Sequence, residues 1–384
     1  MNDDRILLAH GGGGLLTGQL IAEKFLPLFR NPYLERLEDG AVFTIGDRKL
    51  CFTTDSYVVH PIFFPGGDIG SLAVHGTVND LAMCGGKPLF LSAGFILEEG
   101  FPMSDLDCIV TSMAVAAKQA GVQIVTGDTK VVSKGAADGI FINTAGLGMI
   151  DYPKAISVTE IRPGDVIILN GTIGDHGAAI LNQRENLGFE TDILSDSAPL
   201  NGLVEAILQA SPHIHAMRDA TRGGLGAILA EMAEQAQCVI TVEEAHIPIR
   251  EEVRGFCEIL GLDPLFLANE GKMVVFCAAA DAENVLASMQ AHEYGKDAAM
   301  IGRVQEKGRG RFILNTAFDD YKGLSGSQRR GQGKGIYGKK EESVHPFSPR
   351  SACSQLQDVR IFAIQVALSG ICIYSANPPS FATG

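Results

Sequence analysis

Three aspartates in similar sequence contexts are the residues of this chain best suited to binding a metal ion. Asp55 comes after a predicted strand at Leu50–Thr54, Asp128 comes after one at Val122–Val125, and Asp80 lies near the end of a predicted helix. Carboxylates at the ends of neighbouring strands can meet at one edge of a sheet, where Mg²⁺ takes oxygen ligands and keeps waters for exchange with phosphate. Each aspartate alone is compatible with a turn or helix-end role, but the three together favour a magnesium site.

Two lysines and a run of glycines could contact phosphate groups beside such a metal ion. Lys130 and Lys134 follow Asp128 closely, and a lysine near a phosphate site neutralises transferring charge as a point cation. The backbone N–H groups of Gly11–Gly14 could surround phosphates, although no Gly-Lys-Ser/Thr follows and the run is not a P-loop. A solvated Lys134 and a flexible glycine arm remain the alternatives.

Two glycine-containing turns in the second half of the chain are further candidates. Gly171–Gly177 is a glycine loop at a predicted strand-to-helix turn, in which we expect His176 to be packed rather than catalytic. Asp219–Gly224 precedes a predicted helix, and Asp219 or Thr221 could cap that helix. The free N–H groups at the start of the same helix also suit an anion, so the two roles stay open together.

Glu270 is the candidate general base of the sequence. It comes directly before a predicted buried strand, and burial of a carboxyl group raises its pKa toward neutrality, where it can accept a proton. The alternative is a turn glutamate that pairs with Lys272.

The elements that must position these residues fall into four segments. Residues 1–40 form a glycine-rich arm, residues 41–158 and 159–320 each alternate strands with helices, and residues 321–384 have a Gly-, Ser-, Lys- and Arg-rich composition that predicts disorder. In the second alternating region, helices are expected near 202–210, 223–235, 250–260 and 282–292, and strands near 166–169, 238–242, 273–278, 300–304 and 311–316.

Charge and cysteine content exclude several classes of protein. The net charge of −14 is concentrated in residues 1–320, because residues 321–384 hold eight Lys/Arg and three Asp/Glu, and an acidic body repels nucleic acid and anionic membranes. The eight cysteines form no CxxC pair, which argues against a zinc site and indicates reduced thiols. The apolar run Ile361–Tyr374 is too short to span a bilayer, and no signal-type segment is visible. We therefore expect a cytoplasmic protein that binds neither nucleic acid nor membrane.

Taken in order, the motifs resemble the HypE family of ATP-dependent hydrogenase maturation proteins. This family belongs to the superfamily that includes aminoimidazole ribonucleotide (AIR) synthetase and selenophosphate synthetase. The resemblance extends over about residues 5–318. The motifs on which it rests are Phe52–Tyr57, Phe63–Gly70, Gly76–Ala82, Thr126–Val132, Gly171–Gly177, Arg218–Gly224 and Ala268–Gly271.

The resemblance implies a fold, an activity and a set of partners. The fold is the two-domain AIR synthetase-like (PurM-like) fold of the α/β (α+β) class, with an N-terminal sheet domain that dimerises and a C-terminal α/β domain. The activity is the ATP-dependent dehydration of a cysteine S-carboxamide to a thiocyanate, which donates the cyanide ligand of the NiFe-hydrogenase metal centre. The partners are HypF, which loads the carbamoyl group from carbamoyl phosphate, and the HypC–HypD complex, which accepts the cyanide.

The resemblance also implies site residues, with ATP and Mg²⁺ in one cleft. The magnesium ligands would be Asp55, Asp80 and Asp128, and the catalytic residues would be Glu270, Lys130 and Lys134. The implied nucleotide contacts are Gly11, Gly13, Gly14, Asn79, Asp80, Thr129, Asn143, Thr221, Arg222 and Gly223.

The C-terminal segment departs from the family pattern. The family ends in Pro-Arg-Ile-Cys, whose cysteine receives the carbamoyl group, whereas this sequence ends in Ser380–Gly384 and its resemblance stops after Phe318. The composition of the segment suggests out-of-frame translation, and Cys353 and Cys372 are its two thiols. We therefore expect an intact ATP site without the usual substrate cysteine.

Two other functions stay open at this point. The first is a non-catalytic ATP-binding module that pairs with maturation partners. The second is another ATP-dependent synthetase of the superfamily, such as a selenophosphate synthetase. That enzyme would need a reactive cysteine or selenocysteine in the glycine-rich arm, and residues 1–50 contain none.

Overall fold

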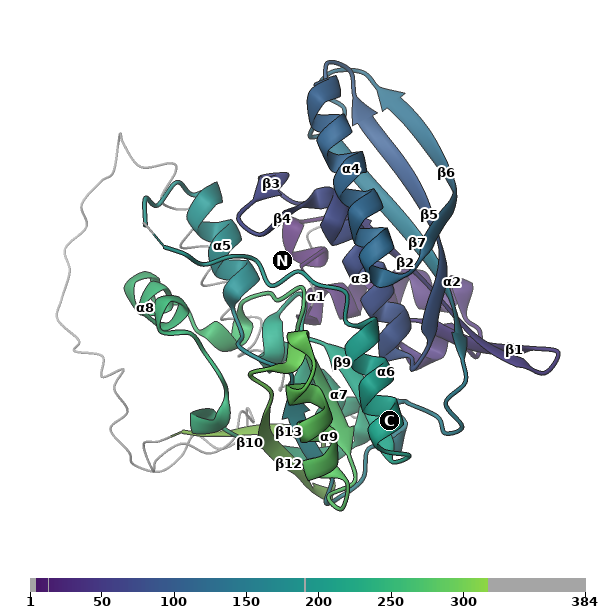
Figure 1. Ribbon diagram of the computed structural model, residues 1–384, viewed down its shortest axis with the longest axis vertical. Helices are drawn as coiled ribbons and strands as arrows, with labels where there is room; N and C mark the ends of the chain where they lie inside the picture. Colours follow the sequence, from purple (N-terminus) through teal and green to yellow (C-terminus); the bar gives the residue numbers. More distant parts are fainter. Residues whose placement is uncertain (1–4, 13, 190, 317–384) are drawn as a thin grey trace, which may run out of the picture.

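The computed structural model describes residues 5–12, 14–189 and 191–316, and within them the chain builds two large sheets flanked by helices (Figure 1). Gly13, Cys353 and Cys372 therefore lie outside the described residues. The arm that precedes the first sheet consists of short helical pieces with many exposed apolar side chains. In chain order these are η1 (Leu8–His10), α1 (Gly14–Leu20), the π-helical η2 (Ile21–Phe25), α2 (Leu26–Phe29) and η3 (Leu34–Arg36).

The first sheet has five strands, with helices α3 (Ile69–Met83) and α4 (Met103–Ala120) packed on one of its faces. Strands β5 and β6 pair in parallel, and the other neighbours pair antiparallel. Because β6 has a neighbour on one side only, it forms an edge of the sheet. The spatial order is β1 (Ala41–Ile45), β2 (Arg48–Tyr57), β7 (Ile140–Ile150), β5 (Lys87–Glu98) and β6 (Gln123–Val132).

Helix α3 is the element that joins the two halves of the molecule. It begins after the small β3–β4 hairpin (Phe63–Phe64 and Gly67–Asp68), where the Asp68 carboxylate accepts the N–H groups of Gly70 and Ser71 and so caps the helix. The helix packs on β2, β7 and α4, and its last turn packs into the core of the second sheet. Contact on several sides buries α3 along nearly its whole length, and it fixes the orientation of the polar residues on the helix.

The second sheet has six strands and helices on both faces. Helix α7 (Gly224–Ala236) covers one face, whereas α6 (Asn201–Ala210) and α9 (Ala282–Gln290) cover the other. Helices α5 (Asp175–Arg184) and α8 (Glu251–Leu260) pack together in a separate apolar cluster. The spatial order of the strands is β13 (Arg311–Asn315), β10 (Cys238–Glu243), β12 (Ala299–Lys307), β8 (Val166–Leu169), β11 (Met273–Cys277) and β9 (Ile214–Asp219).

The predicted elements of the second region are confirmed, each within a few residues of its expected bounds. Strand β9 was not expected, and the first sheet differs at two places: β2 continues through Asp55 and β6 continues through Asp128. The domain boundary near residue 158 stays a prediction, and it falls between the end of β7 and the start of β8. No helix in the described part of the chain has the length and apolar character needed to cross a bilayer.

Candidate active site

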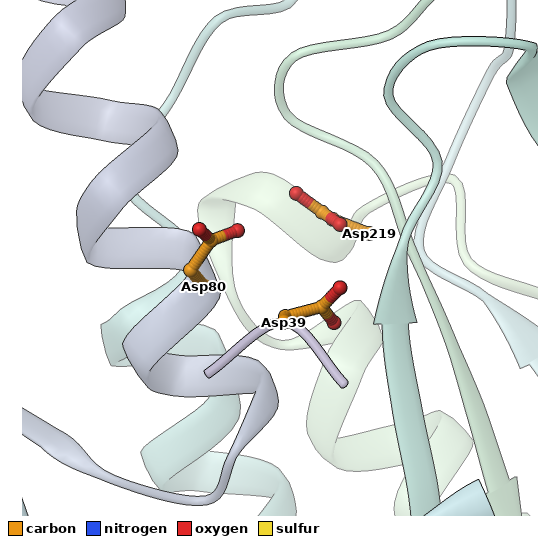
Figure 2. A group of neighbouring side chains, drawn as sticks. All are labelled: Asp39, Asp80 and Asp219. Atoms are coloured by element: carbon orange, nitrogen blue, oxygen red, sulfur yellow. The ribbon is translucent and has the colours of Figure 1, made fainter. Parts of the chain in front are cut away.

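Three carboxylates meet between the two sheets. Asp80 comes from the last turns of α3, Asp219 from the end of β9, and Asp39 from the loop before β1, and Figure 2 shows their side chains turned toward a common space. One oxygen atom from each of the three carboxylates lies within 4.8 Å of the other two. Oxygen atoms from three carboxylates at this spacing are the donor set that hard divalent cations such as Mg²⁺ prefer, so the residues present fit such an ion.

The electrostatics of this aspartate cluster (Asp39, Asp80 and Asp219) favour binding of a cation. Burial, followed by the charges of Asp219 and Asp39, raises the pKa of Asp80 well above its ordinary value. Burial and then the charge of Asp39 raise the pKa of Asp219 to about 7. The hydroxyl of Thr53 donates to Asp80 at 2.9 Å, and Arg218 forms an ion pair with Asp39 at 2.8 Å. These two contacts offset only part of the repulsion among the buried carboxylates.

Asp55 lies beside the aspartate cluster. Its charge contributes to the raised pKa values of both Asp80 and Asp219. Its own carboxylate pairs with the guanidinium of Arg222 at 3.3 Å. Asp55 therefore lies in one acidic cleft with the aspartate cluster, and this name refers below to the region around Asp39, Asp55, Asp80 and Asp219.

Asp128 lies elsewhere, because it points to the other face of the first sheet. Asp55 pairs with Thr144 across the sheet, and because the Thr144 hydroxyl contacts α3, both residues are on the face that α3 covers. Asp128 pairs with Gly94, and Gly94 pairs with Asn143, the chain neighbour of Thr144. Neighbouring residues of a strand point to opposite faces, and three strand spacings separate β2 from β6 by about 14 Å. The predicted grouping of Asp128 with Asp55 and Asp80 is therefore not formed within one chain.

Sequence reasoning missed the roles of Asp39 and Asp219. The sequence offers Asp219 or Thr221 as a cap of the following helix, but helix α7 begins after Gly223, which has a positive φ of 81° and supplies no side-chain cap. Asp219 instead ends the buried strand β9, and the carboxylate at that position was the available signal. Asp39 lies two residues before β1, and the sequence reasoning, which considered aspartates that follow strands, made no prediction for it.

The β9–α7 turn places Arg222 between the arm and the acidic cleft. Its guanidinium donates to the Gly11 carbonyl at 3.1 Å as well as pairing with Asp55. Thr221 and Gly223 flank it in the same turn, and helix α1 starts at Gly14. The glycine-rich segment thus lies next to the cleft, where its backbone N–H groups can approach a phosphate.

Glu270 is a half-buried acid close to the aspartate cluster. Burial, and then the charges of Asp219, Asp196 and Asp55, raise its pKa well above the ordinary value, while Arg222 lowers it. The alternative of a turn glutamate paired with Lys272 is not found, because Lys272 pairs with Asp196 at 3.0 Å. A carboxyl group of this kind, next to a cation site, is suited to proton transfer.

Asn79 was predicted to contact the nucleotide, but its side chain is buried and engaged within the protein. Its amide nitrogen donates to the carbonyls of Ala198 at 3.0 Å and Glu270 at 3.4 Å, and its oxygen accepts the N–H of Leu200 at 2.7 Å. The residue therefore holds backbone in place. His176 is likewise a packed residue, bonded to the Ser195 hydroxyl at 2.8 Å.

The remaining predicted residues lie away from the cluster within one chain. Lys130 pairs with Asp128 at 2.6 Å on the edge strand, and Lys134 is exposed in the loop that follows. Asn143 donates to the Asp55 carbonyl at 2.9 Å from the face that points away from α3. Thr129, together with Asp128, lines an open groove of about 560 Å³ along β6.

Comparison with known proteins identifies the family. Residues 37–150 match the family model for the AIR synthase related protein, N-terminal domain, and residues 162–315 match that for its C-terminal domain. The carbamoyl dehydratase HypE of Azotobacter vinelandii is 53% identical over 304 residues, which cover 79% of this chain and 89% of the relative. The chain belongs to the HypE family.

Two solved HypE structures agree with this assignment. A HypE structure in complex with ATP is 49% identical, with a TM-score of 0.71 and coverage of 84% of this chain and 97% of that one. A HypE–HypF complex is also 49% identical, with a TM-score of 0.75 and coverage of 78% and 97%. The resemblance drawn from the motifs and the expected two-domain α/β fold are therefore confirmed.

Proposed function

We propose that this HypE-family protein uses ATP to dehydrate a cysteine S-carboxamide to a thiocyanate, which serves hydrogenase maturation. The observation that supports this most directly is the aspartate cluster, with Arg222 bonded to Gly11 of the glycine-rich segment and Glu270 close enough for its pKa to be raised by the charges of Asp219 and Asp55. The HypE relatives are named carbamoyl dehydratases, which disfavours a selenophosphate synthetase.

The chemistry divides into a phosphoryl transfer and an elimination. The carbamoyl oxygen attacks the γ-phosphorus of ATP and ADP leaves, which converts a poor leaving group into phosphate. A base then takes protons from the carbamoyl nitrogen, the C–O bond to phosphate breaks, and the C≡N bond forms. Glu270 is the base in this scheme, because its pKa is raised and it lies in the same cleft as the aspartates.

Residues around the cleft have separate tasks in this scheme. Asp39, Asp80 and Asp219 would hold Mg²⁺, which would supply positive charge against the phosphate oxygens of ATP. Arg222 is half-exposed, and its guanidinium can exchange Asp55 for a phosphate oxygen without leaving the turn. Glycines next to Gly11 bring backbone N–H groups to the same place.

A synthetic peptide ending in S-carbamoyl cysteine tests this function without depending on the chain's own thiols. Incubated with the full-length protein, ATP and Mg²⁺, the peptide should lose the mass of one water while ADP and phosphate form in equal amounts. A second incubation with HypF, carbamoyl phosphate and ATP, followed by intact mass and peptide mapping, shows whether a thiol of the chain is modified. ATP binding without dehydration of the peptide would instead support the non-catalytic module.

The homodimer and the further partners belong to the same proposal. Strand β6 is an edge strand on which Val125 and Val131 are 57% and 67% exposed, and an unpaired apolar edge favours pairing with a second copy. HypF would supply the carbamoyl group and the HypC–HypD complex would accept the cyanide. The six cysteines in the described residues form no disulfide, which agrees with a reducing compartment such as the cytoplasm.

A mixed-dimer experiment tests whether Lys130 serves the site of the second copy. Asp80→Asn and Lys130→Met chains are each expected to be inactive alone. If each site takes Asp80 from one chain and Lys130 from the other, a heterodimer has one intact site. Random mixing of the two variants should then restore about a quarter of wild-type activity, because half of the dimers are hybrid and each has one working site.

The control for this experiment mixes Asp80→Asn with Glu270→Gln, since both residues lie in one cleft of one chain. This second mixture should stay inactive. Failure of the first mixture to recover activity, with subunit exchange verified by native mass spectrometry, would show that Lys130 does not act across the dimer.

A further inference from the structure

Residues 191–200, the interdomain strap, run between α5 and α6 and contact both halves of the molecule. The N–H of Ser195 donates to the Pro65 carbonyl at 2.8 Å, and the Ser197 hydroxyl is bonded to Nδ1 of His75 at 3.0 Å. Both contacts attach the strap to the N-terminal half. The same strap then passes beside Glu270. A change in the strap can therefore be transmitted to the candidate base.

The peptide of Glu270 is held on both of its sides. Its N–H donates to Oδ1 of Asp196 at 3.0 Å. Its carbonyl accepts the N–H of Ala198 at 3.5 Å and the side-chain amide of Asn79 at 3.4 Å. Asn79 is the neighbour of Asp80 on α3, so one helix turn connects the base to the aspartate cluster.

The Asp196 carboxylate is also held by a second partner, Lys272. Its side chain is 4% exposed, and Oδ2 pairs with Nζ of Lys272, whose side chain is 13% exposed, at 3.0 Å. Gly271 lies between Glu270 and Lys272, which are both bonded to Asp196. A Cβ atom at Gly271 would come within 1.9 Å of the Asp196 carbonyl oxygen. The backbone approach is therefore too close for any side chain, and the carboxylate sits in one orientation against the Glu270 peptide.

We propose that Asp196 is a positioning residue for Glu270: it anchors the peptide of the base to the interdomain strap and thereby sets the place of the carboxyl group near the aspartate cluster. Asn79 provides the matching hold from α3. Both residues act through Glu270 and through backbone, with no contact to the reacting atoms. The inference rests on the proposed function for its catalytic consequence, but the hold itself can be measured in the unliganded protein.

Amide hydrogen exchange of the full-length protein measures the hold directly. In Asp196→Ala, the amide of Glu270 should exchange roughly tenfold faster or more, because the hydrogen bond to a charged acceptor is lost. Asp196→Asn keeps an oxygen acceptor and should retain most of the protection. Asp192→Ala removes a carboxylate from an exposed position of the same strap and should leave the Glu270 amide unchanged.

Turnover of the S-carbamoyl peptide provides the second readout. Asp196→Ala should lower kcat by roughly tenfold or more with little change in KM for ATP, and Asp196→Asn should restore most of kcat. A merely structural role predicts equal loss in both variants, together with faster exchange across the whole second sheet.

The outcomes separate this inference from the proposed function. If wild type fails to dehydrate the peptide, the proposed function fails, while the exchange data still decide whether Asp196 holds Glu270. If wild type is active and Asp196→Ala keeps both its kcat and the protection of the Glu270 amide, the positioning role is overturned and the proposed function stands.

Discussion

Asp80→Asn is expected to lower ATP-dependent turnover by roughly 100-fold or more, because one of the three charges that hold the cation is removed. The amide is isosteric with the carboxylate, and Thr53 can still bond to it. Loss of one buried charge also relieves the repulsion with Asp219 and Asp39, so the unliganded variant should unfold at the same temperature as wild type or higher. The measurements are steady-state turnover against Mg²⁺ concentration and the thermal shift produced by Mg²⁺ and ATP.

Asp47→Asn is the matched control for this change. Asp47 lies between β1 and β2 with 92% of its side chain exposed, so the same chemical change there removes a charge without touching the cluster. Its turnover and Mg²⁺ dependence should equal those of wild type. Wild-type Mg²⁺ dependence in Asp80→Asn would contradict the assignment of the aspartate cluster as the cation site.

Glu270→Gln should lower kcat by roughly 100- to 10,000-fold, the usual contribution of a general base. Binding of ATP and Mg²⁺ should persist in this variant, because Glu270 supplies none of the three oxygen atoms of the cluster. A quenched-flow measurement should find the elimination slowed more than the phosphoryl transfer. Glu252→Gln, on the exposed first turn of α8, provides the control with the same chemical change.

The pH dependence of stability gives an independent check on Glu270. Its folded-state pKa is raised, mainly by burial, so the native state retains a proton that the unfolded state has lost. The free energy of unfolding contributed by this group therefore falls as pH rises from the ordinary glutamate pKa to the raised pKa, and it is constant above the raised pKa. The glutamine variant lacks this loss, so its stability advantage over wild type should widen across that pH range. An advantage that shrinks with increasing pH would contradict a Glu270 that is protonated in the native state.

Asp128 does not lie with Asp55 and Asp80 within one chain, and the reason is a property of the first sheet that local sequence does not determine. The sequence correctly indicated strands before Asp55 and Asp128, but each strand continues through its aspartate. Whether two strand residues share a face depends on register, and a one-residue change in register moves a side chain to the opposite face. The residue pattern within each strand does not predict that Asp55 pairs with Thr144 or that Asp128 pairs with Gly94.

Local chemistry was sufficient for features that depend on a few consecutive residues. The glycine turn before α5 and the apolar runs of β8 and β11 were visible in the sequence, since each follows from backbone freedom or from side-chain hydrophobicity. The order of the motifs was also enough to indicate the family, because so many family motifs in the same order would not arise by chance.

Only the tertiary structure brought Asp39, Asp80 and Asp219 together, since a loop, a helix and a strand end meet there across both halves of the chain. It also showed that the Asn79 side chain is bonded to backbone groups. The physical reason is the same in both cases. Local sequence sets which groups are available, whereas long-range packing of α3 against both sheets sets the distances between them, and cation binding and proton transfer depend on those distances.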